Sequence, residues 1–333
     1  MASALNQPEI FKLLADRGAD VTGSGAAFDI GHFSGVKSSN NTYLPLLRVL
    51  SSYLGDMIED TPTEAVEGIL PSIIGTPDEF LFLQRHICPS FYQMPHWVRF
   101  AVATRALDKT NVPDPSPETI RTILGDAPLS PQNLQREWPR TSHFHYYPPI
   151  TLVHAIMVTI GRIATNTSRP PSYWNNWNIE ATAILYESWR RLFREILEAG
   201  IDVHQIVAGQ TPLLRFLGRL IFWGSIWPDS NSARWLDWDP ALREWLADLK
   251  SAGIDLNQFG RREESIPKSG MVGREFGWPK YIRLIGFRYG PFPDDWSLWW
   301  SEWTDGFVGE FWAMIERRYE MPGSWPTNTN IIL

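Results

Sequence analysis

The sequence predicts an all-α protein in which pairs of helices stack on one another. Apolar residues recur at offsets of 0, 3, 4 and 7 in several segments, which is the spacing of one helix face, and no long segment alternates like a strand. A capping residue followed by Pro opens two of these segments, at Thr211-Pro212 and Asp239-Pro240. Three helices end in a similar phrase, and such repetition is typical of stacked units.

Five segments carry a single apolar stripe, and each is therefore expected to be a helix that buries its stripe. The segments are residues 6–17, one that begins at Thr151, residues 186–199, one that begins at Thr211, and residues 235–250. The stripes are formed, in the same order, by Ile10, Leu13 and Leu14; by Leu152, Ala155, Ile156, Ile160 and Ile163; by Trp189, Leu192, Phe193, Ile196 and Leu197; by Leu213, Phe216, Leu217, Leu220 and Ile221; and by Leu242, Trp245, Leu246 and Leu249.

The shared phrase at the helix ends indicates a repeated turn. It reads LADRGADV at 14–21, LEAGIDV at 197–203 and LKSAGIDL at 249–256. In each copy a Gly follows the apolar stripe, at the position where the chain turns through the left-handed region. An aliphatic residue and an Asp follow, and Asp is well suited to accept hydrogen bonds from turn amides. We therefore expect left-handed glycines at Gly200 and Gly253.

A proline-rich stretch, residues 108–149, separates two halves of different composition. Of the 17 tryptophans, 15 lie at or beyond Trp174, whereas all seven histidines lie between His32 and His204. Because Pro fixes φ and lacks the N–H donor, this stretch is expected to be extended or to hold only short helices. The expected organisation is an N-terminal helical region (1–107), the connecting segment (108–149), helical repeats with inserted loops (150–260) and a Trp-rich C-terminal cap (261–333).

The repeated phrases resemble those of ankyrin repeats. KLLADRGADVT at 12–22 is similar to the second helix and turn of an ankyrin unit, and GQTPLL at 209–214 is similar to the opening of the next unit. TLVHAI at 151–156 is similar to the same opening, with Leu152 in place of Pro and His154 kept. The resemblance implies a degenerate helical stack in which His154 braces neighbouring turns. It implies no catalytic residue in this chain.

The resemblance covers roughly residues 1–60 and 145–260, and it departs from ankyrin units in length. Gly200 follows Thr151 by 49 residues, whereas a compact ankyrin unit has about 33. We therefore expect insertions between the paired helices. They are placed at residues 166–178 and 224–232.

Such long-insert arrays resemble ankyrin-like proteins of filamentous fungi. There, a phrase like AGIDLNQFGRRE (252–263) precedes a Trp-rich ending similar to GFRYGPFPDDWSLW (286–299). The end of a helical stack needs a polar-faced terminal element, and we expect the Trp-rich ending to be that cap. Two helices are predicted there, with the tryptophans as packing material. The first has Asp294-Asp295 before Trp296, Trp299, Trp300 and Trp303, and the second has Asp305 before Val308, Phe311, Trp312 and Ile315.

Charge, cysteine count and hydropathy exclude several classes of protein. The formal net charge of −7 provides no bulk positive field, so we expect no binding to nucleic acid or to an anionic membrane. The single cysteine, Cys88, excludes a disulfide framework and a multi-cysteine zinc site. No apolar stretch reaches the length of a spanning helix and no signal peptide is visible, so an intracellular protein, cytoplasmic or nuclear, is expected.

The best candidates for chemistry are weak. His143 and His145 alternate as on an extended strand and can share a zinc ion, but no third ligand follows at a recognised spacing. His86, Cys88 and His96 form a weaker pattern. No G-x-S-x-G elbow or phosphate-binding glycine motif is present, and Arg261-Arg262 beside Glu263-Glu264 is interpreted as self-compensated. We therefore predict no catalytic, cofactor-binding or metal-binding residue.

The sequence favours a protein–protein interaction module without catalysis, acting as a monomer on an unidentified protein partner. Inserted loops and inner helices would supply the surface, with four tryptophans as candidates because large aromatic residues are enriched at interface centres. They are Trp174, Trp177, Trp223 and Trp227. Two alternatives remain: an enzyme whose site lies around His143 and His145 with Glu137, and a structural domain of a larger ankyrin protein.

Overall fold

The computed structural model describes residues 8–18, 48, 62, 66, 75–108, 115–141, 146–167, 179–225, 239–266 and 283–301. These residues are mostly helical and contain few strands, as the sequence predicts. The α-helices are α1 (Pro8–Asp16), α4 (Pro77–Ile87), α5 (His96–Asp108), α6 (Pro117–Leu124), α7 (Pro131–Leu134), α8 (Leu152–Thr167), α9 (Ile179–Glu198), α10 (Pro212–Ser225), α11 (Asp239–Ser251) and α12 (Leu256–Ser265). The other elements are the 3-10 helices η3 (Phe91–Gln93) and η5 (Pro293–Asp295) and the strands β1 (Trp138–Thr141), β2 (Tyr146–Ile150), β3 (Arg283–Arg288) and β4 (Ser297–Ser301).

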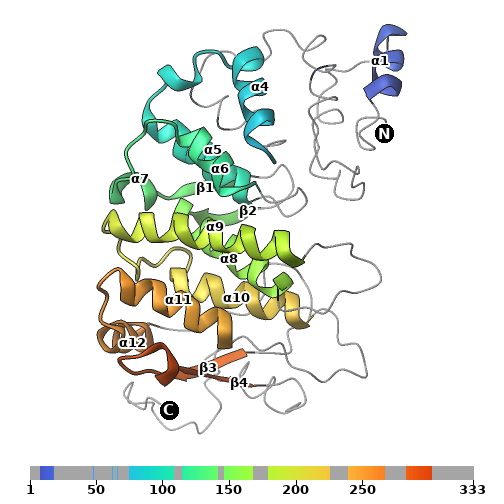
Figure 1. Ribbon diagram of the computed structural model, residues 1–333. Helices are drawn as coiled ribbons and strands as arrows, with labels where there is room; N and C mark the ends of the chain where they lie inside the picture. The colour runs from blue at the N-terminus through green and yellow to red at the C-terminus, as the bar shows by residue number, and fades with distance from the viewer. Residues whose placement is uncertain are drawn as a thin grey trace, which may run out of the picture.

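The helices from α5 to α11 form two rows, and successive layers follow the order of the chain (Figure 1). In the inner row α8 packs between α5 and α10, and in the outer row α9 packs between α6 and α11. Within a layer, α5 packs against α6 and α8 against α9. Each helix therefore buries its apolar stripe against its partner and against the layers above and below.

Several helices begin in the same way, with a hydroxyl cap followed by Pro. The cap oxygen accepts a hydrogen bond from the backbone N–H three residues later, which satisfies one of the free donors of the first turn. Thr76 does so from Glu79 N, and the Glu79 side chain bonds back to Thr76 N at 2.9 Å. The same arrangement of cap and Pro begins the other helices at Ser116-Pro117, Ser130-Pro131 and Thr211-Pro212. Pro117 and Pro131 of the proline-rich stretch thus begin short helices, as expected.

The glycines of the repeated phrase adopt the predicted conformation. Gly18, Gly200 and Gly253 have φ of +86°, +80° and +83°. Gly125, which follows α6, has φ of +59° and makes a further turn outside the repeated phrase. In Figure 1 the turns that follow α6, α9 and α11 lie at the left of the stack, where α7 and α12 also lie.

The predicted stripes of α8 to α11 are buried wherever their side chains are described. Trp245 of α11 connects these stripes to one another. Its ring stacks on Phe193 of α9 and Phe216 of α10, with centroids 5.9 and 5.7 Å away. Phe259 of α12 lies 5.8 Å away, and the indole Nε1–H donates to Sδ of Met157 on α8 at 3.3 Å. One aromatic residue thus contacts four other helices, so these layers share a single core.

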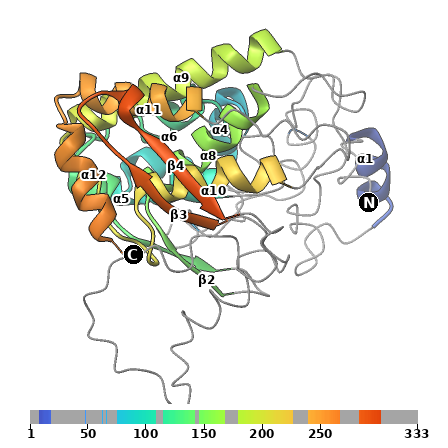
Figure 2. The same ribbon diagram turned by 90° about the horizontal axis from the view of Figure 1, so that it is seen from below.

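The predicted helix after Asp294-Asp295 is wrong. Residues 297–301 form strand β4, which pairs antiparallel with β3 from Arg288↔Ser297 to Arg283↔Ser301. The two aspartates lie in η5, the connection between the strands, instead of capping a helix. The hairpin lies below α10 and α11 in Figure 1 and in front of them in Figure 2. The apolar spacing misled because a short run of tryptophans fits a strand as well as a helix, and the partner strand decides between them.

Trp296, which precedes β4, is nevertheless packing material, as the sequence analysis expected. It is 3% exposed, and its Nε1–H donates to the carbonyl oxygen of Gly290 at 3.1 Å. Its ring stacks on Phe287 of β3 at 5.5 Å and lies 5.9 Å from Phe259 of α12. The side chains of Trp299 and Trp300, and the second predicted helix with Asp305, lie outside the described residues.

The prediction that α1 buries its apolar stripe is also wrong. Ile10, Leu13 and Leu14 are 50%, 52% and 47% exposed. No other described element packs closely against α1, so the stripe has no neighbouring layer to cover it. The boundary expected between residues 260 and 261 falls inside α12, the helix that follows the last turn. This helix and the hairpin contribute side chains to the same core cluster and therefore belong to one packed unit.

Candidate functional site

The turns that connect successive layers lie on one side of the stack and are here named the turn edge: residues 125–136, 199–211 and 252–256. Gln135 joins the first two turns. Its side-chain amide accepts from Asp202 N and donates to Asp202 O, both at 2.9 Å, and Gln205 Nε2 donates to the carbonyl oxygen of Gln135 at 2.8 Å. Because the contacts use backbone groups of both turns, they fix one layer against the next.

His154 joins the start of α8 to the turn before α10. Its Nε2 lies 3.1 Å from the carbonyl oxygen of Gln210, and its Nδ1 lies 2.7 Å from the hydroxyl of Thr151. The ring is fully buried. Burial, and then the nearby positive charge of Arg215, lower the pKa of His154 to about 4. A neutral ring therefore holds the two turns together near neutral pH.

A second buried polar cluster joins the same turn to α12. His204 Nδ1 lies 2.6 Å from one carboxyl oxygen of Glu263, and the hydroxyl of Thr211 donates to the other at 2.8 Å. Glu263 is 1% exposed and binds these two residues, so it is not the surface partner of Arg261-Arg262 that the sequence suggested. Glu264 instead accepts from the hydroxyl of Tyr289 at 2.9 Å. The Glu263 side chain couples α12 to the stack.

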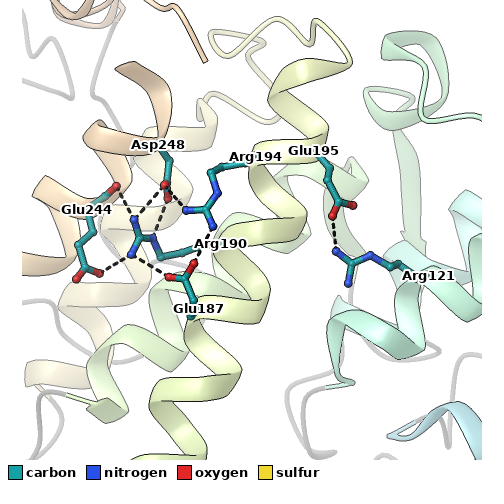
Figure 3. A network of polar contacts seen from close by, with 7 residues as sticks. All are labelled: Arg121, Glu187, Arg190, Arg194, Glu195, Glu244 and Asp248. Atoms are coloured by element: carbon teal, nitrogen blue, oxygen red, sulfur yellow. Dashed lines mark hydrogen bonds and ion pairs between the residues drawn. The ribbon is translucent and has the colours of Figure 1, made fainter. Parts of the chain in front are cut away.

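The outer row is held by ion pairs (Figure 3). Arg190 of α9 binds Asp248 of α11 with two hydrogen bonds, at 2.8 and 3.0 Å, and Arg194 binds the same carboxyl group at 3.0 Å. Asp248 is only 3% exposed. On the other side of α9, Arg121 of α6 binds Glu195 at 2.7 Å. Charged groups thus connect all three outer helices.

The inner helices offer less surface than the sequence analysis expected. In residues 151–164 and 211–220, which include most of α8 and α10, every side chain is buried or half-buried. The turn edge, in contrast, contains exposed residues such as Asp202 and Ile206, the latter 49% exposed. The turn edge is therefore more open to a partner than the described parts of these inner helices.

The predicted site residues fall largely outside the described part of the chain. Trp174, Trp177 and Trp227 lie outside it, and for Trp223 only the backbone, in α10, is described. His143 and His145 also lie outside it. Glu137 is exposed beside β1.

The weaker His86–Cys88–His96 pattern holds no shared site. Cys88 is buried, whereas His86 and His96 are exposed, and His86 Nδ1 lies 2.9 Å from the carbonyl oxygen of Phe82. In the described residues no group of three or more His, Cys, Asp or Glu side chains is placed to hold a metal ion. None of the helices described is long and apolar enough to cross a membrane.

One surface feature was not foreseen from the sequence. Trp97, at the start of α5, stacks on Trp138 of β1 with ring centroids 5.6 Å apart and planes at 20°. The guanidinium carbon of Arg136 lies over both rings, 5.3 and 4.8 Å from their centroids. Trp97 and Trp138 are 41 residues apart in the sequence, so only the packing of β1 against α5 brings them together.

Comparisons with known proteins add no further assignment. No protein-family model matches the chain, and neither the search of curated proteins nor the search of solved structures gives a significant match.

Proposed function

We propose that the chain is a degenerate ankyrin-like helical stack that binds another protein and performs no catalysis. The observation that carries the proposal is the set of hydrogen bonds that join the turns to one another and to helices of neighbouring layers. Gln135 bonds to Asp202, His154 to Gln210, and His204 to Glu263. Stacked units of this kind present a long rigid surface, which suits recognition of another macromolecule.

The contacts of His154 support the resemblance in particular. The resemblance implies a histidine that braces neighbouring turns, and the ring bonds both to Thr151, which caps its own helix, and to Gln210, directly before Thr211-Pro212. The two segments that resemble ankyrin openings, 151–156 and 209–214, thus contact each other through this residue. Such contacts between adjacent units are what a repeat stack needs for stability.

The four candidate tryptophans belong to, or lie next to, the segments that join an inner to an outer helix. Trp174 and Trp177 lie between α8 and α9, and Trp227 lies between α10 and α11, close after Trp223. Figure 1 shows α8 and α10 ending on the same side, opposite the turn edge. We propose that these tryptophans contact the partner at that end of the stack.

The test is capture of a partner by the tagged full chain from an extract of its source cells. Double variants Trp174→Ala/Trp177→Ala and Trp223→Ala/Trp227→Ala are compared with Ile184→Ala, which removes an apolar side chain that is 63% exposed on α9. We expect that the wild type and Ile184→Ala capture the same protein. A tryptophan variant of unchanged stability should fail to capture it. Equal capture by all variants would contradict the proposal that these tryptophans contact the partner. If no protein is captured and the chain has a catalytic activity that is lost in His143→Ala, the proposal is contradicted and the enzyme alternative is favoured.

A further inference from the structure

We infer that Arg136, held by Trp97 and Trp138, is a binding site for a carboxylate group of a protein partner. This inference rests on the proposed function and adds to it the chemistry of one contact. It places that contact on the turn edge.

The Arg136 guanidinium lies beside two packed indole rings. Its central carbon is about 5 Å from both ring centroids, within the distance at which a cation is attracted by an aromatic ring. Trp97 is half-buried and Trp138 is 8% exposed, so neither ring is free to turn away. An arginine held in this way has lost part of its side-chain freedom before any ligand arrives.

The N–H groups of Arg136 remain open to a ligand. The side chain is exposed and makes no hydrogen bond or ion pair within the described residues. Arg190 is the contrast, because Asp248, Glu187 and Glu244 occupy its donors. A contact with aromatic rings occupies none of the five N–H donors of a guanidinium, which form a planar fork that matches a carboxylate with two hydrogen bonds.

The residue before Arg136 makes this a rigid anchor. Gln135 bonds to both Asp202 and Gln205 of the next turn, so the backbone of Arg136 starts from a fixed position. Arg and Trp are the residues most enriched among those that dominate binding energy at protein interfaces. The half-buried ring of Trp97 supplies apolar surface for the stem of an Asp or Glu side chain.

The charges favour a carboxylate over a phosphate group. Arg136 carries one positive charge, its neighbour Glu137 is also exposed, and the chain has a net charge of −7. A single carboxylate is matched by that one charge. A phosphate group, with up to two negative charges, needs further cations, and Glu137 and the net charge of the chain oppose it.

The test is an NMR titration of the full chain labelled with ¹⁵N in arginine. The probes are acetyl-Gly-Glu-Gly-amide, acetyl-Gly-Gln-Gly-amide and inorganic phosphate, and the observed signals are the arginine Nε–H groups. Arg191 is the internal control, since it is exposed on α9 with no ion pair or ring contact among the described residues. Arg136→Lys and Arg191→Lys assign the two signals.

We expect the Glu peptide to bind at Arg136 about threefold or more tighter than at Arg191, because the Arg136 side chain is already partly ordered. The Gln peptide should leave the Arg136 signal unchanged, and phosphate should bind less tightly than the Glu peptide. Equal concentration dependence at the two arginines, or tighter binding of phosphate, overturns the inference.

The outcome is separable from that of the proposed function. A captured partner that binds the wild type and Arg136→Gln equally well overturns the role of Arg136 but leaves the interaction function intact. A titration that distinguishes Arg136 from Arg191, with no protein captured, leaves the carboxylate site intact and overturns the proposed function.

Discussion

His154 Nε2 lies 3.1 Å from the carbonyl oxygen of Gln210, 56 residues further along the chain. A carbonyl oxygen only accepts, so Nε2 carries the proton and donates. In the neutral ring Nδ1 then accepts from the hydroxyl of Thr151, whose oxygen in turn accepts from His154 N at 3.2 Å. The contact between two layers thus depends on the protonation state of one ring.

Acid should therefore weaken the stack through His154. Its pKa falls from 6.5 to about 4 on folding, so the unfolded chain binds more protons between these values. The stabilisation contributed by the neutral His154 ring is complete above pH 6.5 and is lost as the pH falls toward 4. Between pH 7.5 and 5 the free energy of unfolding should drop by about 2 kcal/mol from this residue alone, as urea denaturation at each pH can measure.

His154→Asn is the control for this pH dependence. The variant keeps a short polar side chain but cannot titrate, so its stability should depend less on pH than that of the wild type, even though it is less stable at pH 7.5. Other groups titrate in both proteins and cancel in the difference. Parallel curves for the two proteins would show that His154 is not buried in its neutral form.

The turn glycines should resist substitution because of their backbone conformation alone. A Cβ atom at Gly200 or Gly253 would meet nothing within 4 Å, so crowding is not the cause. With φ near +80° at both, Ala should cost about 1 kcal/mol at each site. Asn, which tolerates this region better, should cost less than Ala. Thermal melts in which Ala and Asn behave alike would contradict the left-handed turns.

These turns, and the helices α8 to α11, could be predicted from the sequence because their signals are local. An apolar stripe, a capping residue with Pro, and a Gly after the stripe all lie within one helix length. Helices α4 and α6 carry similar local signals in the sequence, at Thr76-Pro77 with Glu79 and at Ser116-Pro117.

The strands and the surface site depend on contacts between distant residues. Residues 297–301 become a strand because residues 283–288 pair with them. The spacing of apolar residues within 297–301 carries no information about this pairing. Arg136 and Trp138 are neighbours in the sequence, but the site also needs Trp97 from another element. Similarly, the burial of Glu263 depends on His204 and Thr211, which are distant from it in the sequence.

Asp248 should contribute more to stability than the other acidic residues of the outer row. It is nearly buried and accepts from both Arg190 and Arg194, so Asp248→Ala leaves two partly buried cations without this partner. We expect a loss of about 2–3 kcal/mol. Glu195→Ala removes the more exposed pair with Arg121 and should cost about 1 kcal/mol or less. Equal losses in urea denaturation would contradict the difference in burial.

The last prediction separates packing from surface roles in the C-terminal hairpin. Trp296 is 3% exposed and lies among Phe259, Phe287 and Tyr289, whereas Phe292 is 57% exposed four residues earlier. Trp296→Ala leaves a cavity beside α12 and should cost about 3–5 kcal/mol. Phe292→Ala removes mainly a contact with Lys250 and should cost about 1 kcal/mol or less. Because Phe259 also contacts Trp245, the Trp296 variant should unfold the layers of α10 and α11 in the same transition. A separate early transition, with the main melting temperature unchanged, would show that the hairpin is an independent module and that Trp296 does not stabilise the stack.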